Sequence, residues 1–216
     1  MKKEIKDKYI LIDNETGECF SVDEVVYKKS KHITKQLIEH MIDNAENIMD
    51  IDINLLYSYL RSKGEINQYH QVKLKEMWCK DELFKIATDD EINLVGYFFN
   101  LLQYAHKWTN IIYDREGNNY AKDWKDVHAT AGITNNGTKT KFKKFCEKHD
   151  LIRQVKLVTN KGSRLQKMIV NPFLYRAREH TDVLAIAGFN DLCKSGVNID
   201  KLTYIYLHIK GLIEDK

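Results

Sequence analysis

The N-terminal part of the chain changes from a strand-like to a helix-like pattern of apolar residues. Two apolar runs flank a segment of turn-forming residues, which predicts a β-hairpin over residues 8–26. Apolar residues then recur every three or four positions over residues 30–49, which predicts an amphipathic helix. A shorter helix is expected over residues 53–63, ended by Gly64. Residues 1–65 are therefore expected to form an accessory unit.

The next stretch combines a short strand with a long apolar helix. Residues 69–78 have the pattern of a strand, and residues 88–108 have that of a buried helix. Thr88 is a suitable N-cap for this helix, and the three acidic residues that follow it suit the positive end of the helix dipole. Residues 110–120 then join a strand pattern to a turn rich in glycine and asparagine.

Two short helix patterns follow, with a glycine between them. Residues 123–134 have helical spacing, and Gly132 stands where a C-cap is expected. In the next pattern, four residues at spacings of four, three and four share one face: Thr138, Phe142, Phe145 and His149. The opposite face carries Asn136, Thr140, Lys143 and Lys144, with Lys139 at its margin. The second helix is therefore expected to have an apolar inner face and a lysine-rich outer face.

A predicted β-hairpin comes directly after these helices. Residues 151–159 and 165–170 have strand patterns on either side of a polar turn that contains Gly162, and the tip carries Lys161 and Arg164. Two helices joined by a glycine-containing turn and followed by such a hairpin are typical of a winged helix-turn-helix. We therefore predict an α+β, mainly helical fold: a winged helix-turn-helix with an N-terminal hairpin and helix extension and with C-terminal helices.

The second helix of this motif has side chains that suit the major groove of DNA. Lysine can bond to guanine or phosphate, asparagine can pair with adenine, and threonine can contact a base edge. A basic hairpin tip can reach phosphates or the minor groove. The candidate DNA-binding residues are Asn135, Asn136, Thr138, Lys139, Thr140, Lys143, Lys144, Lys161, Arg164 and Lys167. Double-stranded DNA is the expected partner.

The distribution of charge along the chain is more informative than its total of +3. Residues 1–120 contain 16 lysine and arginine residues against 21 aspartate and glutamate residues. Residues 121–180 contain 14 against 5. A local positive excess of this size is typical of a polyanion-binding surface, and the alternative is a basic face that is merely solvated.

The run from about Tyr69 to Tyr175 resembles the winged-helix replication proteins of plasmids and phages from low-GC Gram-positive bacteria. The resemblance rests on the order of four segments, which are YHQVKLKEMW, INLVGYFFNLLQYAH, AGITNNGTKTKFKKFCEKHDLI and MIVNPFLY. It implies recognition of an origin or operator in replication or plasmid maintenance. The DNA-contacting positions would be Asn136, Lys139, Thr140, Lys143, Lys161 and Arg164. The sequence departs from the family pattern at Asp150, where a glycine is common, at Phe142 and Phe145, and in its added N-terminal unit.

The resemblance implies a sequence-specific DNA-binding protein of plasmid or phage replication or maintenance. One alternative is a transcriptional regulator on the same fold, and another is a protein-interaction module whose winged helix contacts a protein. Fold alone does not choose between these functions. Replication or regulatory proteins are expected as further partners.

The expected DNA-binding domain covers residues 66–180. Residues 181–216 are expected to form two further helices, one over residues 181–196 and one over residues 198–216. In the last helix, an apolar stripe consists of Leu202, Ile205, Tyr206 and Ile209. This stripe belongs either to the core or to a dimer interface. We favour a homodimer, because winged-helix domains that bind DNA repeats gain affinity from a second copy.

Residues capable of catalysis or metal binding are scattered along the chain. Cys146 and His149 could supply two metal ligands, with His128 nearby, but they also lie at core-facing positions of a helix. Aromatic residues from Tyr104 to Trp124 could stack on single-stranded bases, although core packing is favoured. The sequence contains no P-loop, HExxH motif or catalytic triad pattern. We predict a protein with no enzymatic activity, no metal site and no cofactor.

The sequence also bears on location. The most apolar stretch, residues 94–102, is too short to span a membrane and contains Asn100. The N-terminus lacks the apolar segment of a secretory signal. Four cysteines stand far apart with no CxxC spacing, which suits a reducing compartment. A cytoplasmic location without membrane contact is therefore expected.

Overall fold

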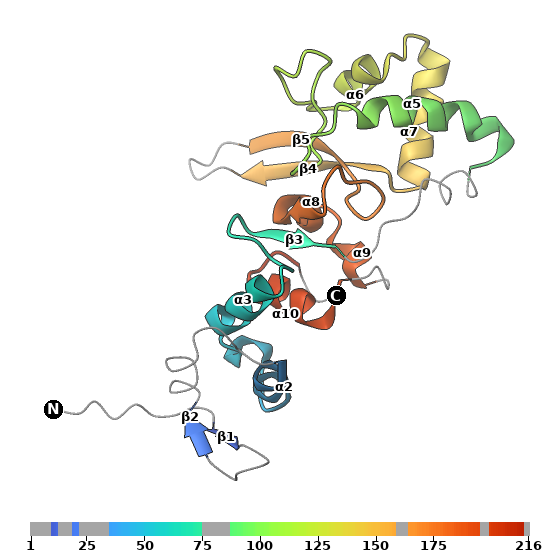
Figure 1. Ribbon diagram of the computed structural model, residues 1–216. Coiled ribbons are helices and arrows are strands. Elements are labelled where there is room, and N and C mark those ends of the chain that lie inside the picture. Colours follow the sequence, from blue (N-terminus) through green and yellow to red (C-terminus); the bar gives the residue numbers. More distant parts are fainter. Residues whose placement is uncertain are drawn as a thin grey trace. The chain divides into compact units, whose positions relative to one another are not determined.

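The structure is a computed structural model that describes residues 10–12, 19–21, 35–74, 87–158, 164–194 and 199–213 (Figure 1). The chain divides into two compact units, Met1–Gly64 and Glu65–Lys216. Both contain helices and a small antiparallel sheet, so the predicted α+β class is confirmed. Within the described ranges, every helix is too short or too polar to cross a lipid bilayer.

The first unit consists of a small hairpin followed by helices. Strands β1 (Ile10–Ile12) and β2 (Cys19–Ser21) pair antiparallel, as predicted, and the loop between them lies outside the described residues. Helix α2 (Lys35–Asp43) is followed by the 3-10 turn η1 (Ile48–Asp50) and by helix α3 (Ile53–Ser62). The helix predicted before Gly64 is thus confirmed as α3.

The helix predicted over residues 30–49 is shorter than expected. At the end of α2, the side-chain amide of Asn44 donates a hydrogen bond to the carbonyl oxygen of His40 at 2.7 Å. Asn47 then uses its side chain to cap η1. Asparagine side chains compete with the helical backbone for hydrogen bonds, which the apolar spacing does not reveal. The first residues of the predicted range lie outside the described part of the chain.

Three helices form the core of the second unit. Helix α5 (Ile92–Leu102) follows the 3-10 turn η2 (Asp89–Glu91). Helices α6 (Trp124–Ala131) and α7 (Asn136–Lys148) both pack against α5. The buried core that they share contains Val95, Phe98, Leu101, Val127, Ala131, Phe142 and Phe145.

The helix predicted over residues 88–108 begins at Thr88, as expected, but ends early. After Leu102 the chain leaves the helix, and Ala105 forms an antiparallel bridge with Ile112. The residues directly beyond α5 therefore form turns and one isolated β-bridge instead of a continued helix. Their helix-like spacing could not distinguish the two states, because short apolar runs suit either one.

A β-hairpin follows α7, as the sequence predicts. Strands β4 (Ile152–Val158) and β5 (Arg164–Val170) pair antiparallel along their whole length. The tip between them lies outside the described residues. On the other edge of β5, the backbone of Met168 exchanges hydrogen bonds with Ile112 and Ala121, at 3.0 and 2.9 Å. Two extended segments thus broaden the hairpin.

The rest of the second unit brings together segments far apart in the sequence. Strand β3 (Gln71–Lys73) pairs antiparallel with β6 (His180–Asp182). Helices α8 (Val183–Ala187), α9 (Asn190–Lys194) and α10 (Lys201–Ile209) follow β6. The pairing of β3 with β6 was not predicted.

The single helix predicted at residues 181–196 is wrong. The chain first forms β6, and the carboxylate of Asp182 then caps α8 by accepting a hydrogen bond from the Leu184 N–H at 2.8 Å. The helix stops at Gly188, where an added Cβ would lie 2.8 Å from the side chain of Val155 on β4. Glycine permits this close approach between the helix and the strand.

The apolar stripe expected on the last helix is divided between the core and the surface of the chain. Ile205 and Tyr206 are buried, whereas Leu202 and Ile209 are half-buried. The Tyr206 hydroxyl lies 3.1 Å from Nδ1 of His70. Half of the stripe thus serves intramolecular packing, and the dimer interface stays a prediction.

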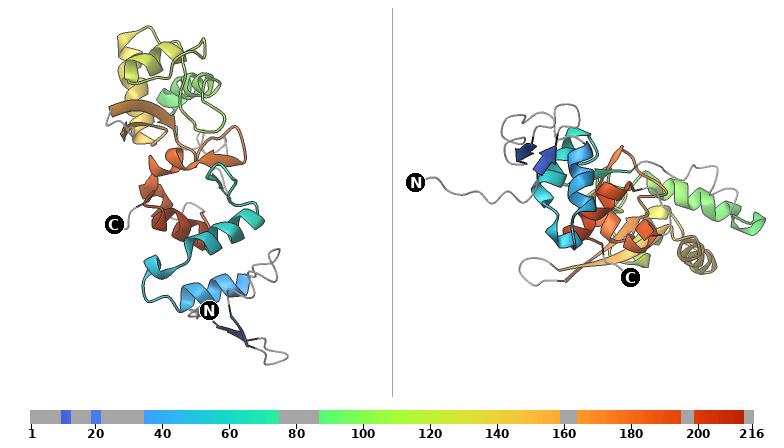
Figure 2. Two further views of the ribbon diagram at one scale, coloured as in Figure 1. Left: turned by 90° about the vertical axis from the view of Figure 1, so that its left-hand side faces the viewer. Right: turned by 90° about the horizontal axis from the view of Figure 1, so that it is seen from below.

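The hairpin lies between α5–α7 on one side and α8 and α9 on the other (Figures 1 and 2). Arg153 on β4 joins it to the C-terminal helices. Its Nε donates to Asp150 Oδ1 at 2.6 Å, and its Nη2 donates to Asp191 Oδ2 at 2.9 Å. The guanidinium group also lies 4.6 Å from the centre of the Phe189 ring. The hydrogen bonds to Asp191 and Asp150 raise the pKa of Arg153, with that to Asp191 as the largest cause.

Candidate nucleic-acid interface

Helix α6 is fixed at both ends. The Asp123 carboxylate caps its N-terminus by accepting two backbone N–H hydrogen bonds from the first turn. Gly132 ends it with a φ of +78°, as the sequence predicts. The Arg115 side chain lies so close to Gly132 that a Cβ there would clash, and its Nε donates to the Thr130 carbonyl oxygen at 3.0 Å. The direction in which the chain enters α7 is therefore set locally.

The inner face of α7 is apolar and buried. Asn135 caps the helix, because its Oδ1 accepts a hydrogen bond from the Thr138 N–H at 3.1 Å. Phe142 and Phe145 are almost completely buried, and the Phe142 ring meets Tyr97 of α5 edge to face, with centroids 6.3 Å apart. The predicted inward direction of both phenylalanines is confirmed.

The outer face of α7 carries most of the candidate residues of that helix. Asn136, Thr140, Lys143 and Lys144 are exposed, and Thr138 and Lys139 are half-buried. The Thr140 hydroxyl donates to the Asn136 carbonyl oxygen at 3.2 Å, and Lys139 Nζ donates to Asn136 Oδ1 at 3.4 Å. Lys143 Nζ lies 3.7 Å from Glu147 Oε1. The exposed side chains form one polar surface with few internal partners.

The candidate residues of the hairpin do not gather on one described surface. Lys161 lies outside the described residues, as does the side chain of Arg164. Lys167 is half-buried, with its Nζ 4.6 Å from the centre of the Tyr120 ring. Because Lys167 stands opposite Val155, its side chain leaves the strand on the face that turns toward α8. Lys156, which sequence reasoning missed, is exposed and leaves β4 on the other face.

A buried histidine lies where α6 meets α7. The His128 ring stacks near Trp124, with centroids 5.9 Å apart, and its Nε2 has no hydrogen-bond partner among the described residues. Burial lowers the pKa of His128 below its usual 6.5, and the charge of Lys139 lowers it further. Lys143 Nζ lies 5.9 Å from the centre of the Trp124 ring. The lysines of this edge of α7 are thus close to a neutral, aromatic surface.

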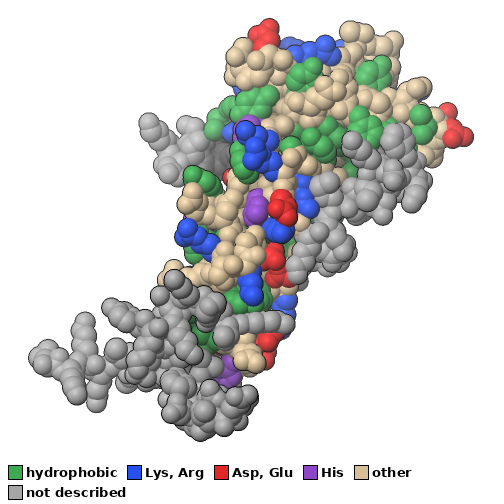
Figure 3. All heavy atoms as spheres, in the orientation of Figure 1, with side chains coloured by type: hydrophobic (Ala, Val, Ile, Leu, Met, Phe, Trp, Pro, Cys, Tyr) green, Lys and Arg blue, Asp and Glu red, His purple; other side chains and the backbone are tan. Residues whose placement is uncertain are grey.

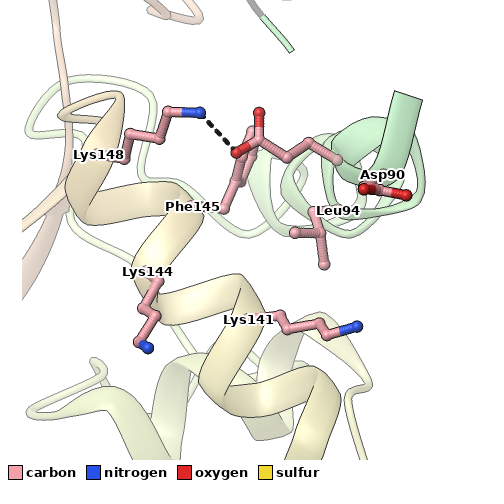
Figure 4. Close-up of a pocket in the computed structure, with 7 residues that line it drawn as sticks. Asp90, Leu94, Lys141, Lys144, Phe145 and Lys148 are labelled. Atoms are coloured by element: carbon pink, nitrogen blue, oxygen red, sulfur yellow. Dashed lines mark hydrogen bonds and ion pairs between the residues drawn. The ribbon is translucent and has the colours of Figure 1, made fainter. Parts of the chain in front are cut away.

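Sequence reasoning also missed a hollow on the opposite edge of α7, beside the start of α5 (Figure 4). It has a volume of about 390 Å³. Its lining consists of Asp90, Glu91, Leu94, Lys141, Lys144, Phe145 and Lys148. Lys141 and Lys148 were not among the candidates, although their spacing of three and four residues from Lys144 places all three on one edge of a helix.

One carboxylate in this lining has several partners. Glu91 accepts hydrogen bonds from the Thr88 N–H at 3.1 Å and from Lys148 Nζ at 2.9 Å. Nε2 of His149 lies 3.3 Å from its second oxygen. The hydrogen bond from Lys148 is the main reason why the pKa of Glu91 falls to about 2. On this edge of α7, Lys148 therefore forms an ion pair with Glu91.

Most side chains considered as metal ligands or as rings for base stacking have partners within the protein or are buried. Cys146 is fully buried, which raises the pKa of its thiol, and His149 faces Glu91. The described ranges contain no group of three or more metal-ligating side chains. The rings of Trp108 and Trp124 have cationic side chains of this chain over them, and both are half-buried.

Positive charge is spread over more than one surface of the second unit. On the face drawn in Figure 3, lysine and arginine side chains form several separate groups with apolar side chains between them. The lysine and arginine side chains on this face therefore do not form one continuous patch. The arrangement of lysines on α7 is the feature that needs explaining.

A comparison with protein-family models gives no match, and comparisons with curated proteins and with solved structures give none either.

Proposed function

We propose that the second unit binds double-stranded DNA through a winged helix-turn-helix, with α7 as the recognition helix and the β4–β5 hairpin as the wing. The observation that supports this most is the division of α7 into two faces. Its aromatic face is buried, whereas Asn136, Thr140 and Lys143 stand in solvent. A helix divided in this way can enter a major groove, which is about 12 Å wide, without losing its own packing.

The proposed mechanism is binding without chemical conversion. Lys139, Lys143 and Lys144 neutralise phosphates and release the counterions that surround them. Asn136 and Thr140, between these lysines, contact base edges. The Lys143–Glu147 pair is exposed at both ends, so it costs little to exchange the carboxylate for a phosphate.

We also propose a role in replication or plasmid maintenance. This part of the proposal is based on the resemblance of the sequence to winged-helix replication proteins. A transcriptional regulator would use the same surface of α7. The two roles differ in the position of the bound site, at an origin or at a promoter. Selecting the fragments that the protein binds from the whole plasmid or genome that carries its gene distinguishes the two roles.

A homodimer is also part of the proposal, since two copies on repeated half-sites bind more tightly than one. The half-buried Leu202 and Ile209 of α10 remain available for such contact. Sedimentation of the protein with and without a duplex of two half-sites tests this. A single copy per duplex at saturation would exclude the dimer.

The DNA-binding proposal is tested by fluorescence anisotropy of a random-sequence duplex at several salt concentrations. The expected result is that the binding constant of the unmodified protein falls steeply as the salt concentration rises. The slope of log K against log salt concentration should be about −0.9 for each phosphate that the protein neutralises. The combined variant K139Q/K143Q/K161Q/R164Q should have a salt slope that is smaller by about 0.9 for each phosphate that its four lost cations neutralised. A protein that binds no duplex at low salt would refute the proposal and direct the search to protein partners.

Base reading by α7 has its own test. Asn136→Ala should weaken binding to a selected site by about 1–3 kcal/mol, because an asparagine pairs bidentately with adenine. Binding to a random duplex should hardly change, because Asn136 carries no charge. Anisotropy on both duplexes measures the difference, and equal losses on the two would show that Asn136 does not read a base.

A further inference from the structure

Helix α7 carries lysines along two opposite edges. Lys139 and Lys143 follow the edge beside α6, where Lys143 lies over the Trp124 ring. A second row, Lys141, Lys144 and Lys148, lines the hollow beside the start of α5. At 100° per residue, Lys141 is about 160° around the helix axis from Lys143. The uncharged Asn136 and Thr140 lie between the two rows.

The second row has charge available for a ligand. Among the described residues, neither Lys141 nor Lys144 has an ion-pair partner, and Figure 4 shows both side chains pointing away from the Glu91–Lys148 pair. Lys148 is paired with Glu91, but more than half of its side chain is exposed. Glu91 would keep its contacts with Thr88 and His149 if a ligand took Lys148.

We infer, on the basis of the DNA binding proposed above, that Lys141, Lys144 and Lys148 contact the phosphates of one strand while Lys139 and Lys143 contact those of the other. An α-helix with its side chains is about 10–12 Å across and fills the major groove. A phosphate backbone then runs along each of its edges. Two rows of lysines on either side of an uncharged stripe match two lines of phosphates on either side of the base edges.

An acidic protein segment is the other occupant to consider for the second row. It would need only one row of lysines and would give no reason for the uncharged stripe between two rows. Asp90 and Glu91 line the same hollow and would repel an acidic peptide and a phosphate alike, so they do not distinguish the two ligands. The arrangement of both rows therefore favours duplex DNA.

The test compares the salt dependence of duplex binding in matched variants that each lack three lysines. K141Q/K144Q/K148Q removes the second row. K107Q/K201Q/K210Q removes the same charge from exposed lysines elsewhere in the second unit. On a random duplex of about 24 base pairs, we expect the slope to fall by about 0.9 for each phosphate that the first variant no longer neutralises. The slope of the control should equal that of the unmodified protein.

A change of opposite sign sharpens the test. Glu91→Gln removes a negative charge and releases Lys148, so it should raise duplex affinity several-fold and steepen the salt dependence. A purely structural role of the row would not produce this increase. A thermal melt of each variant checks that the fold is kept.

The outcomes separate the inference from the proposed function. No duplex binding by the unmodified protein refutes both. Binding that falls in K139Q/K143Q but is the same in K141Q/K144Q/K148Q as in the control overturns the second row, including the role of Lys144, and leaves DNA binding by α7 standing. Loss of poly-glutamate binding in that triple variant, with the duplex slope intact, would also overturn it and assign the row to an acidic protein segment.

Discussion

Arg153 on β4 and Lys143 on α7 belong to the same basic segment, but their surroundings differ. Arg153 is about three-quarters buried, and it binds the carboxylates of Asp150 and Asp191 and the ring of Phe189. Lys143 is exposed, and its nearest acid, Glu147, lies on the same helix at 3.7 Å. One cation joins parts of the fold, and the other faces solvent.

This difference shows why a local excess of positive charge does not by itself mark a binding surface. A buried or half-buried cation with internal carboxylate partners contributes to folding, and a ligand would have to displace those partners. An exposed lysine with a weak partner costs little to transfer to a phosphate. The positive excess therefore divides into a structural part around Arg153 and a solvent-exposed part on α7, where we propose that DNA binds.

The strongest test of this division compares the two faces of α7. Phe142→Ala should lower the free energy of unfolding by about 3–5 kcal/mol, because it leaves a cavity in a fully buried aromatic site. Thr140→Ala, on the exposed face, is the control and should change it by less than about 0.5 kcal/mol. Urea denaturation measures both. Equal costs would mean that α7 does not pack through its aromatic face.

The next test replaces each of the two cations, Arg153 and Lys143, with methionine in separate variants. Arg153→Met should lower the free energy of unfolding by about 1–3 kcal/mol, since it leaves two partly exposed carboxylates without their partner. Lys143→Met should leave stability within about 0.5 kcal/mol. On a random duplex the order should reverse, with the salt slope lower by about 0.9 in Lys143→Met only. A reduced slope in Arg153→Met would contradict the structural assignment of Arg153.

The sequence predicts the elements that are set by neighbouring residues. The left-handed Gly132 and the spacing of Phe142 and Phe145 mark α6, α7 and their turn. Each of these signals lies within a few residues of the structure that it determines. This local character explains why the helix pair and the hairpin could be predicted in detail.

What could not be predicted depends on distant partners or on competing side chains. Strand β3 lies within the strand pattern of residues 69–78, but its partner β6 has only three residues and no pattern of its own, so the pairing was missed. In the candidate site, the second lysine row was missed because its importance depends on α5 lying beside it. The regular spacing of Lys141, Lys144 and Lys148 was the one signal in the sequence.

Asp150 provides a smaller test, at the position where related patterns have glycine. Its φ of +54° is left-handed, a conformation that costs other residues roughly 1–2 kcal/mol relative to glycine. Asp150→Ala and Asp150→Gly both remove the carboxylate that binds Arg153. Asp150→Ala should therefore be less stable than Asp150→Gly by roughly 1–2 kcal/mol in urea denaturation. Equal stability would show that the backbone relaxes away from this conformation.

The smallest effect is expected for Glu91, which pairs with Lys148 of the proposed second lysine row. Its pKa falls from 4.5 to about 2, so its contribution to stability is present above pH 4.5 and is lost as the pH falls toward 2. We expect less than about 1 kcal/mol, because Lys148 is more than half exposed. Denaturation between pH 5 and 2, a range of roughly three units, should show a flatter profile in Glu91→Gln. Identical profiles would contradict the ion pair.

The pairing of β3 with β6 has a consequence for the synthesis of the protein. Val72 pairs with Thr181, so the ribosome produces the whole α5–β5 core before it completes the partner of β3. During this interval β3 has unpaired backbone groups, and an unpaired strand edge is a template for contact with another chain. The nascent protein is therefore open to mispairing at β3 until His180–Asp182 have emerged.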